Sequence, residues 1–333
     1  MSKYSLRKYN IIDKSKWDDL VESSVNGTIF HTQQFISYHP ENRFKDNSLM
    51  FFKGEKLIAV FPAAIIYKEN KKILKSHPGT SYGGIVFVES PSLELCFKMF
   101  QILEDFAKAE GFSSIEFRHS PKIFNKYPLD QIEFAMGHLG YVREAEELST
   151  CYYLPDFFDL TDNQIISKFK LNNKRNLKKS INSNLEFQWI DSDKNLKLFY
   201  NILEDNLLKH KTTPVHSLDE IKKLIKLFPQ KVKIAGAFLG DELLGGVMLF
   251  KINEKAWHIF YSVLDYQKSN YHPVHFLVFH LIKHFSENKI TWLNYGISTE
   301  NSGKIINHDL FRFKEGFSGH GIIRTYWTHN VGS

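Results

Sequence analysis

Cysteine is scarce in this sequence, because Cys96 and Cys151 are the only two cysteines among 333 residues. They form no CxxC pair and show no metal-ligand spacing. These facts argue against a disulfide framework and against a cysteine-ligated metal, and they favour two reduced, buried thiols.

Long hydrophobic runs are also missing. The longest, Leu57 to Tyr67, contains Pro62 and is far shorter than the roughly twenty apolar residues of a membrane helix. The first residues, MSKYSLRKYNIIDKSKW, are polar and of mixed charge, unlike a secretory signal. The sequence therefore predicts a cytoplasmic protein without a transmembrane segment.

Several catalytic and metal-binding motifs are absent as well. No Gly-x-Ser-x-Gly elbow or catalytic cysteine pattern supports a hydrolase. No HExxH occurs, and the pair His280 and His284 has no carboxylate at the expected spacing. We therefore expect no metal site, and we interpret the two histidines as a partly exposed pair on an amphipathic helix.

The composition has enough hydrophobic residues to form two well-packed hydrophobic cores. Hydrophobic residues make up 43% of the 333 residues and aromatic residues 15%. A chain of this length exceeds the size at which a single core usually keeps growing, so two domains are expected. The net charge of +6 is modest, and the placement of the basic residues is therefore more informative than their excess.

The first half of the chain predicts the element order β-β-β-α-β. Two apolar runs flank the turn at Lys53–Lys56 within residues 48–68, and a third covers residues 81–88. Helical spacing of apolar residues then predicts a helix over Ser92–Glu110, which Gly111 ends. Residues 113–119 predict a short strand.

The same order returns in the second half. Residues 231–240, 242–252 and 255–264 predict strands joined by turns, followed by a helix over Pro273–Glu287 and a strand over residues 290–296. This repetition indicates a duplicated lobe. We therefore expect an α+β (mixed α/β) fold of two tandem lobes, each a mainly antiparallel mixed sheet flanked by helices.

The boundaries of the lobes are predicted at residues 1–155 and 160–333. Residues 154–160, with Pro155 and two aspartates, are the expected hinge. Two capping boxes follow, Thr161 with Gln164 and Ser217 with Glu220, and each predicts the start of a helix.

Four segments carry a family resemblance in the order in which they occur: NGTIFHT at 26–32, KRNLKK at 174–179, LGG at 244–246 and FRFKEGFSG at 311–319. With these segments and the two lobes, the chain resembles the FemAB-like group of the GNAT acyltransferase superfamily. The resemblance implies two GNAT-like lobes that transfer an acyl or aminoacyl group to an amine. It also implies acyl-CoA or aminoacyl-tRNA as the donor, bound by the second lobe.

The sequence departs from the family pattern in two places. Residues 196–231 have room for two ordinary helices but not for the long helical arm of some members, which weakens the case for tRNA. Residues 265–272 lack the Gly-x-Gly of simple CoA-dependent acetyltransferases, which weakens the case for CoA. Peptidoglycan and other cell-envelope precursors, nucleotide-linked sugars, lipids and small amines are all possible acceptors. The alternative reading is a non-catalytic binding module for an anionic ligand or RNA.

Basic residues cluster between Lys168 and Lys179, a stretch with six cations and no acid. On a helix they would form two adjacent rows, and Lys174, Arg175 and Lys179 are the predicted phosphate-binding residues. The alternative is a solvated helix face. In the first lobe, Tyr82 and Arg118 stand at predicted strand ends, where they could line a cleft for the acceptor.

Lys314 is the strongest catalytic candidate. In relatives the matching lysine faces substrate phosphate or the developing oxyanion, and a fixed cation there would stabilise the transition state. The alternative is a surface lysine paired with Glu315. The attacking amine must also lose protons, and Asp265 and Tyr261 are the candidate acceptors, with His258 expected on the same strand face as Tyr261. A turn or cap role for Asp265 and a core role for Tyr261 are the alternatives.

Overall fold

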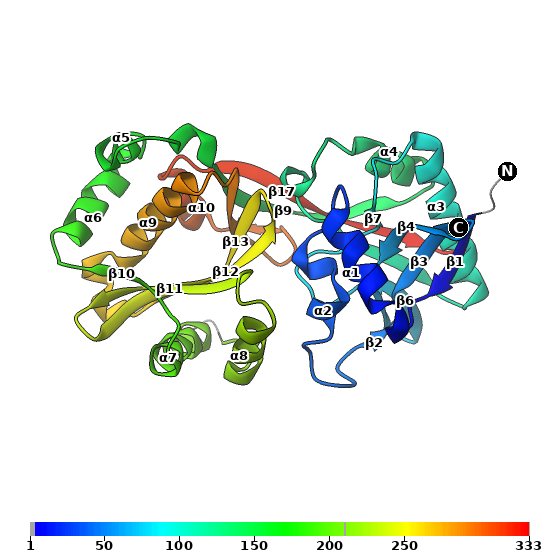
Figure 1. Cartoon of the computed structure of the whole chain (residues 1–333), viewed down its shortest axis with the longest axis horizontal. Coiled ribbons are helices and arrows are strands. Elements are labelled where there is room, and N and C mark those ends of the chain that lie inside the picture. The colour runs from blue at the N-terminus through cyan, green and yellow to red at the C-terminus, as the bar shows by residue number, and fades with distance from the viewer. Residues whose placement is uncertain (1–3, 210, 333) are drawn as a thin grey trace. The chain divides into compact units, whose positions relative to one another are not determined.

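The computed structural model describes residues 4–209 and 211–332. The chain forms two compact units (Figure 1): one extends to Glu147 and includes the chain from Ile323, and the other comprises Leu148–Ile322. The expected hinge at 154–160 lies within the second unit, where Leu154–Phe157 forms a 3-10 turn. The chain passes between the units in strand β9 (Val142–Tyr153) instead of in a proline-containing loop.

The first unit contains two sets of strands. One is the sheet β1 (Tyr4–Lys8), β3 (Leu49–Lys53), β4 (Lys56–Phe61) and β7 (Val86–Phe87), in that order. The other runs in the order β17 (His320–Asn330), β8 (Ser114–Arg118), β6 (Lys71–Ser76), β5 (Ala63–Lys68) and β2 (Lys45–Asp46). The helices are α1 (Lys14–Ser23), α2 (Gln33–Ile36), α3 (Leu93–Ala109) and α4 (Asp130–His138).

The prediction of three strands between residues 48 and 88 was too simple. Pro62 divides the second apolar run into β4 and β5, which belong to different sheets. Proline has no N–H for the ladder, so a strand is interrupted there. The structure also adds β6, which the sequence reading missed. The helix predicted over 92–110 is confirmed as α3, and Gly111 follows it with φ of 70°.

In the second unit the strands are adjacent in the order β10 (Glu186–Trp189), β11 (Val232–Leu239), β12 (Glu242–Asn253), β13 (Ala256–Leu264), β14 (Trp292–Ile297) and β9. Its neighbours are antiparallel except for the parallel pair β13–β14. The predicted strands and the helix α9 (Pro273–Glu287) are confirmed. A short hairpin, β15 (Thr299–Glu300) and β16 (Ile305–Ile306), precedes α10 (His308–Glu315).

Helices cover both faces of the second unit's sheet. In Figure 1, α6 (Leu171–Ile181) and α9 lie on one side, and α7 (Asp193–Lys209) and α8 (Leu218–Leu227) lie on the other. Both predicted capping boxes form, one at α8 and one at α5 (Asp162–Ser167). Within the described residues, no helix is both long enough and apolar enough to span a membrane.

The glycine pair of β12 permits close helix packing on both faces. A Cβ on Gly245 would lie 3.4 Å from Pro273 of α9, and one on Gly246 would lie 2.7 Å from the Phe199 ring of α7. Successive strand residues point to opposite faces, so each glycine admits one helix. This explains the Leu-Gly-Gly segment structurally.

We expect Gly246→Ala to lower the free energy of unfolding by about 1–3 kcal/mol, because the added methyl group would collide with the Phe199 ring and with the Ala235 carbonyl oxygen, 3.1 Å away. Gly137→Ala, at an exposed position of helix α4, is the control. A Cβ there meets no atom within 4 Å and should raise stability by about 0.5–1 kcal/mol. Urea unfolding of both variants tests this, and equal effects at the two positions would contradict it.

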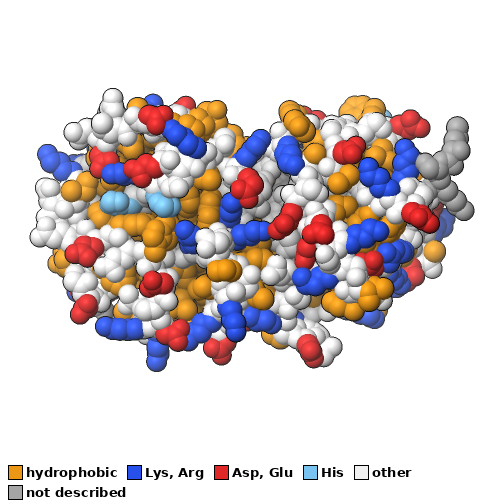
Figure 2. Space-filling model, viewed as in Figure 1, with side chains coloured by type: hydrophobic (Ala, Val, Ile, Leu, Met, Phe, Trp, Pro, Cys, Tyr) orange, Lys and Arg blue, Asp and Glu red, His pale blue; other side chains and the backbone are white. Residues whose placement is uncertain are grey.

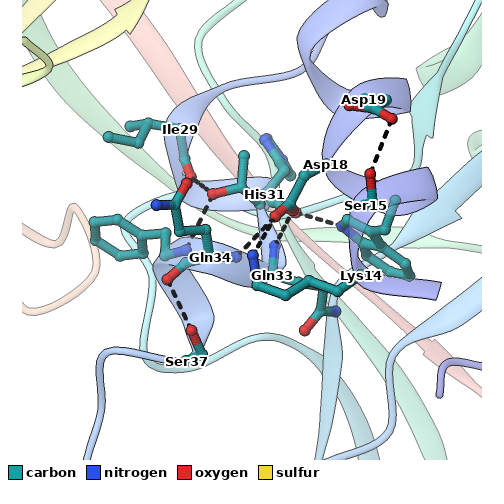
Figure 3. A network of polar contacts seen from close by, with 12 residues as sticks. Lys14, Ser15, Asp18, Asp19, Ile29, His31, Gln33, Gln34 and Ser37 are labelled. Atoms are coloured by element: carbon teal, nitrogen blue, oxygen red, sulfur yellow. Dashed lines mark hydrogen bonds and ion pairs between the residues drawn. The ribbon is translucent and has the colours of Figure 1, made fainter. Parts of the chain in front are cut away.

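The NGTIFHT segment is held by hydrogen bonds within the first unit. Asn26 bonds the backbone of Ile85 and Phe87 through its two amide atoms, each at 2.8 Å. His31 is fully buried, accepts from the Thr28 N–H at 3.0 Å, and burial lowers its pKa to about 4. Figure 3 shows the adjoining contacts, in which Asp18 of α1 accepts from the Gln33 N–H at 2.6 Å. The segment fixes α1 and α2 to the strands.

Candidate active site

The parallel strands β13 and β14 separate part-way along their length. They pair at Ala256 with Trp292, at Trp257 with Leu293 and at His258 with Asn294, and then the ladder ends while both strands continue. Beyond that point the Ser262 and Tyr295 hydroxyls lie 3.2 Å apart. The two strands therefore diverge next to buried polar groups.

Gly296 lies where the strands diverge. Its φ of 70° suits glycine, and a Cβ there would approach the Ile259 carbonyl oxygen at 3.6 Å and the His258 ring at 3.7 Å. The β14–β9 ladder is irregular between Asn294 and Ile297, so this part of β14 bulges. Asn294 holds the bulge, because its Oδ1 lies 2.6 Å from His258 Nδ1 and accepts from the Gly296 N–H.

Lys314 projects from α10 to this bulge. Its Nζ donates to the carbonyl oxygens of Gly296 at 3.0 Å and Ile297 at 2.7 Å, and it lies 5.2 Å from the Tyr295 ring centroid. The residue is only 3% exposed, and burial lowers its pKa from 10.5 to about 7. Glu315 instead faces Lys170, at 3.5 Å, so the reading of Lys314 as a surface lysine paired with Glu315 was wrong.

Three buried hydroxyls, one on β9 and two directly after β14, have no hydrogen-bond partner among the described residues. They belong to Thr150, Ser298 and Thr299. Ser298 follows the Ile297 carbonyl that Lys314 contacts, and Thr150 lies against Gly319, whose Cβ position also approaches the Lys314 carbonyl. Buried hydroxyls are normally satisfied, so these groups favour a polar ligand or water at this position.

Helix α9 begins beside the basic helix α6. His272 precedes it in the left-handed conformation, with φ of 52°, and its side chain makes no capping hydrogen bond. Burial, and then the charge of nearby Lys179, lower the pKa of His272, while Asn176 of α6 lies 3.3 Å from His275. A helix start with a lysine beside it suits an anion. Lys174 is half-buried on α6, and Arg175 is exposed and bonds Asn172 of its own helix.

Asp265 and Tyr261 occupy the C-terminal part of β13 and its end. Asp265 caps the following 3-10 turn, Tyr266–Tyr271, by accepting from the Gln267 N–H at 2.9 Å. Tyr261 lies 3.1 Å from His216 Nδ1, and burial raises its pKa. Strict alternation along the strand would put His258 and Tyr261 on opposite faces of the sheet. A register shift at Phe260 changes this: His258 pairs with Phe250 and Tyr261 pairs with Met248. Because Phe250 and Met248 are two residues apart on β12, His258 and Tyr261 share one face.

Comparison with known proteins gives a likeness in structure but not in sequence. The sequence matches no family model, and no curated protein matches it significantly. The structure matches that of FemX with a TM-score of 0.72, at 10% identity, over 98% of this chain and 97% of that one. L-PGS from Bacillus licheniformis matches with a TM-score of 0.60 at 12% identity, over 96% and 93% of the two chains.

A third solved structure shows the same likeness in fold. A tandem GNAT protein from the clavulanic acid biosynthesis pathway matches over 99% of both chains, with a TM-score of 0.55 and 9% identity. This chain has the FemAB-like, tandem GNAT fold. The predicted fold class and superfamily fold are thereby confirmed. Identities of 9–12% show the fold alone.

The two lobes of this GNAT fold differ at their parallel strand pairs. In the first unit β6 and β8 also pair at three positions, Ile73–Ser114 to Lys75–Glu116. There the gap beyond the ladder is closed: the Ser76 hydroxyl accepts from the Arg118 N–H at 2.8 Å, and Gly83 donates to the Arg118 carbonyl at 2.7 Å. In the second unit, the strands diverge beside the buried Lys314.

The predicted acceptor residues lie in the first unit. Tyr82 is buried, with the Arg324 guanidinium carbon 5.7 Å from its ring, and Arg118 stacks on Tyr326 at 5.3 Å. His280 and His284 instead pack on Phe187 and Trp189. No group of three His, Cys, Asp or Glu side chains suited to a metal occurs in residues 4–209 and 211–332.

Sequence reasoning missed Asn294, Tyr295 and Gly296, although it predicted their strand. An asparagine and a glycine are both unusual inside a strand, and an interior glycine often marks a bulge. The presence of both residues in the predicted strand is the sequence feature that could have indicated the bulge.

Proposed function

We propose that this chain is an N-acyltransferase, and that its second unit binds the donor of an acyl or aminoacyl group. The observation that carries the proposal is Lys314, a buried lysine aimed at the bulge of β14 where the parallel strands separate. A donor carbonyl placed there would gain negative charge when an amine attacks it. A preorganised ammonium stabilises that charge more than it stabilises the bound substrate.

The donor is an acyl-CoA or an aminoacyl-tRNA, both of which carry phosphates. Lys179 beside the start of α9 is the first candidate to hold them, and Lys174 and Arg175 extend the basic surface along α6. The fit rests on three features: the open β13–β14 gap, the uncapped helix start and the unsatisfied hydroxyls near Lys314. The acceptor is an amine, and cell-envelope precursors and nucleotide-linked sugars remain the leading classes.

Thermal unfolding with acetyl-CoA, longer acyl-CoAs, free CoA and UDP-linked sugars tests the donor class. A ligand at about a hundred times its dissociation constant should stabilise the folded chain by roughly 2.7 kcal/mol. A shift with acyl-CoA that exceeds the shift with UDP-sugars supports a CoA donor. If no CoA shifts the transition and no aminoacyl-tRNA serves as donor, the proposal is wrong.

The second candidate function is a non-catalytic module that binds an anionic ligand or RNA through the α6 cations. On the face shown in Figure 2, Lys and Arg side chains are mixed with Asp and Glu, which is not the pattern of an extended basic surface. RNA binding governed by phosphate contacts would weaken steeply as salt rises. Steep salt dependence without acyl transfer would favour the binding module.

The proton acceptor can be identified by two conservative variants. Asp265 is our candidate, because the raised pKa of Tyr261 keeps the phenol protonated and unsuited to accept a proton. Asp265→Asn retains an oxygen to cap Gln267 but loses basicity, and we expect kcat/KM to fall about a hundredfold with no change in Tm. Tyr261→Phe should change kcat/KM less than about tenfold. If Asp265→Asn turns over its substrate at an unchanged rate, Asp265 is not the proton acceptor and acts only as the cap of the 3-10 turn.

A further inference from the structure

The first unit contains a cluster of charged and aromatic side chains that its folding alone does not explain. Arg118 of β8 is the register partner of Tyr326 of β17. Arg324, two residues before Tyr326, and Glu147 of β9 complete the cluster. The guanidinium carbons of Arg118 and Arg324 each lie 5.3 Å from the centroid of the same Tyr326 ring.

The charges in this cluster do not balance. Glu147 accepts from Arg324 Nε at 2.9 Å and from the Tyr326 hydroxyl at 2.5 Å, so its single negative charge is matched to Arg324. The other nearby carboxylate, Glu116, forms an ion pair with Lys75 at 2.5 Å. One positive charge, that of Arg118, therefore remains without a carboxylate partner among the described residues.

The Arg118 guanidinium is held in place but not used for hydrogen bonding. Its Nε is buried and has no acceptor among the described residues, whereas its terminal nitrogens are not among the buried unsatisfied atoms. Burial is the main cause that lowers the pKa of Arg118, with Arg324 adding to the effect. Arg118 is partly buried, and its terminal nitrogens stay available to donate to an anion. A partly desolvated cation beside Arg324 and without a carboxylate partner favours an anion from outside the chain.

We propose that Arg118 binds a carboxylate or phosphate group of a ligand, with Arg324 and Tyr326 positioning its guanidinium. Guanidinium matches both groups, because two parallel N–H donors face two anionic oxygens. Only the identity of the ligand rests on the proposed function: in an N-acyltransferase of this fold the anionic group would belong to the acceptor. The anion site itself does not depend on acyl transfer.

Calorimetric titration of the full chain with inorganic phosphate, and separately with acetate and malonate, at constant ionic strength in chloride tests the site. We expect measurable binding by the natural sequence and at least about tenfold weaker binding by Arg118→Met, the effect of losing a charge-assisted hydrogen-bond pair. Tighter binding of phosphate than of the carboxylates would assign a phosphate ligand, and the reverse order a carboxylate. Arg118→Lys keeps the positive charge but loses the paired N–H donors of the guanidinium, and it should bind the anion with intermediate affinity.

Arg143→Met is the matched control. Arg143 also stacks on an aromatic residue of β17, Trp327 at 5.7 Å, but it has a carboxylate partner in Glu146 at 2.7 Å. We expect this variant to bind phosphate as the natural sequence does. Arg118→Met should also have a Tm in chloride no lower than that of the natural sequence, since an unpaired cation is removed.

Three results would overturn the proposal: no binding of any of the three anions, equal loss of binding in the Arg118→Met and Arg143→Met variants, or unchanged phosphate affinity of Arg118→Met. The outcome is separable from that of the proposed function. Lys314→Ala lies in the other unit and should leave phosphate binding at Arg118 intact, so a failure of acyl transfer would not imitate a failure of this site.

Discussion

Replacing Lys314 by alanine is expected to lower kcat/KM by about two to three orders of magnitude on the donor identified by the thermal-unfolding screen. The Lys314 ammonium already faces the Gly296 and Ile297 carbonyl oxygens inside a desolvated bulge, so it needs no reorganisation when charge develops on the substrate. The loss should fall mainly on kcat, because an interaction formed only in the transition state does not alter substrate affinity.

Lys170→Ala is the control for this experiment. Lys170 lies at the start of α6 and forms an ion pair with Glu315, the neighbour of Lys314, but it is largely exposed. Its replacement should change kcat/KM by less than about threefold, as expected for an exposed pair. If Lys314→Ala raises KM tenfold or more with kcat unchanged, Lys314 holds a substrate phosphate and does not stabilise the transition state.

Replacing Lys314 by methionine is expected to make the chain more stable at pH 6, by about 1–3 kcal/mol. The pKa of Lys314 is about 7 in the folded chain and 10.5 when exposed, so burial of the charged form destabilises the fold. Below pH 7 the lysine is charged in both states and the destabilisation is complete. As pH rises from about 7 to 10.5, the folded state releases its proton first and the natural sequence gains stability.

Urea unfolding at pH 6 and pH 9 measures this effect. The advantage of Lys314→Met should shrink strongly at pH 9, whereas Lys170→Met, which alters an exposed pair, should differ from the natural sequence by the same amount at both values. An advantage for Lys314→Met that does not change with pH would mean that the lysine is not buried in its charged form. A variant more stable and less active than its parent is typical of a strained functional site.

The predicted elements that matched the structure were those with strong local signals. Alternating apolar residues predicted β11, β12 and β13, and a helical pattern bounded by Pro273 predicted α9. The capping boxes at Thr161 and Ser217 formed as expected, because the cap and its partner are three residues apart. Interactions of this range are contained in the sequence pattern itself.

The prediction failed where distant segments had to meet. The sequence left open a surface position for Lys314, because its burial depends on the bulge of β14, 18 residues earlier in the chain. The division of residues 57–68 between β4 and β5 was missed for the same reason, since Pro62 disrupts one ladder but cannot indicate which strands pair on either side.

The sequence by itself determined the helices α3 and α9, the capped starts of α5 and α8, the strands β11 to β14, the repeated order of elements and the segments that resemble the FemAB-like group, because periodicity, caps and turns act over a few residues. Only the tertiary structure decided that the parallel strands β13 and β14 diverge and that Lys314 is desolvated. It also decided that Arg118 has no carboxylate partner among the described residues. Those properties follow from desolvation and from the pairing of charges, and both depend on residues that lie far apart in the chain and meet only after folding.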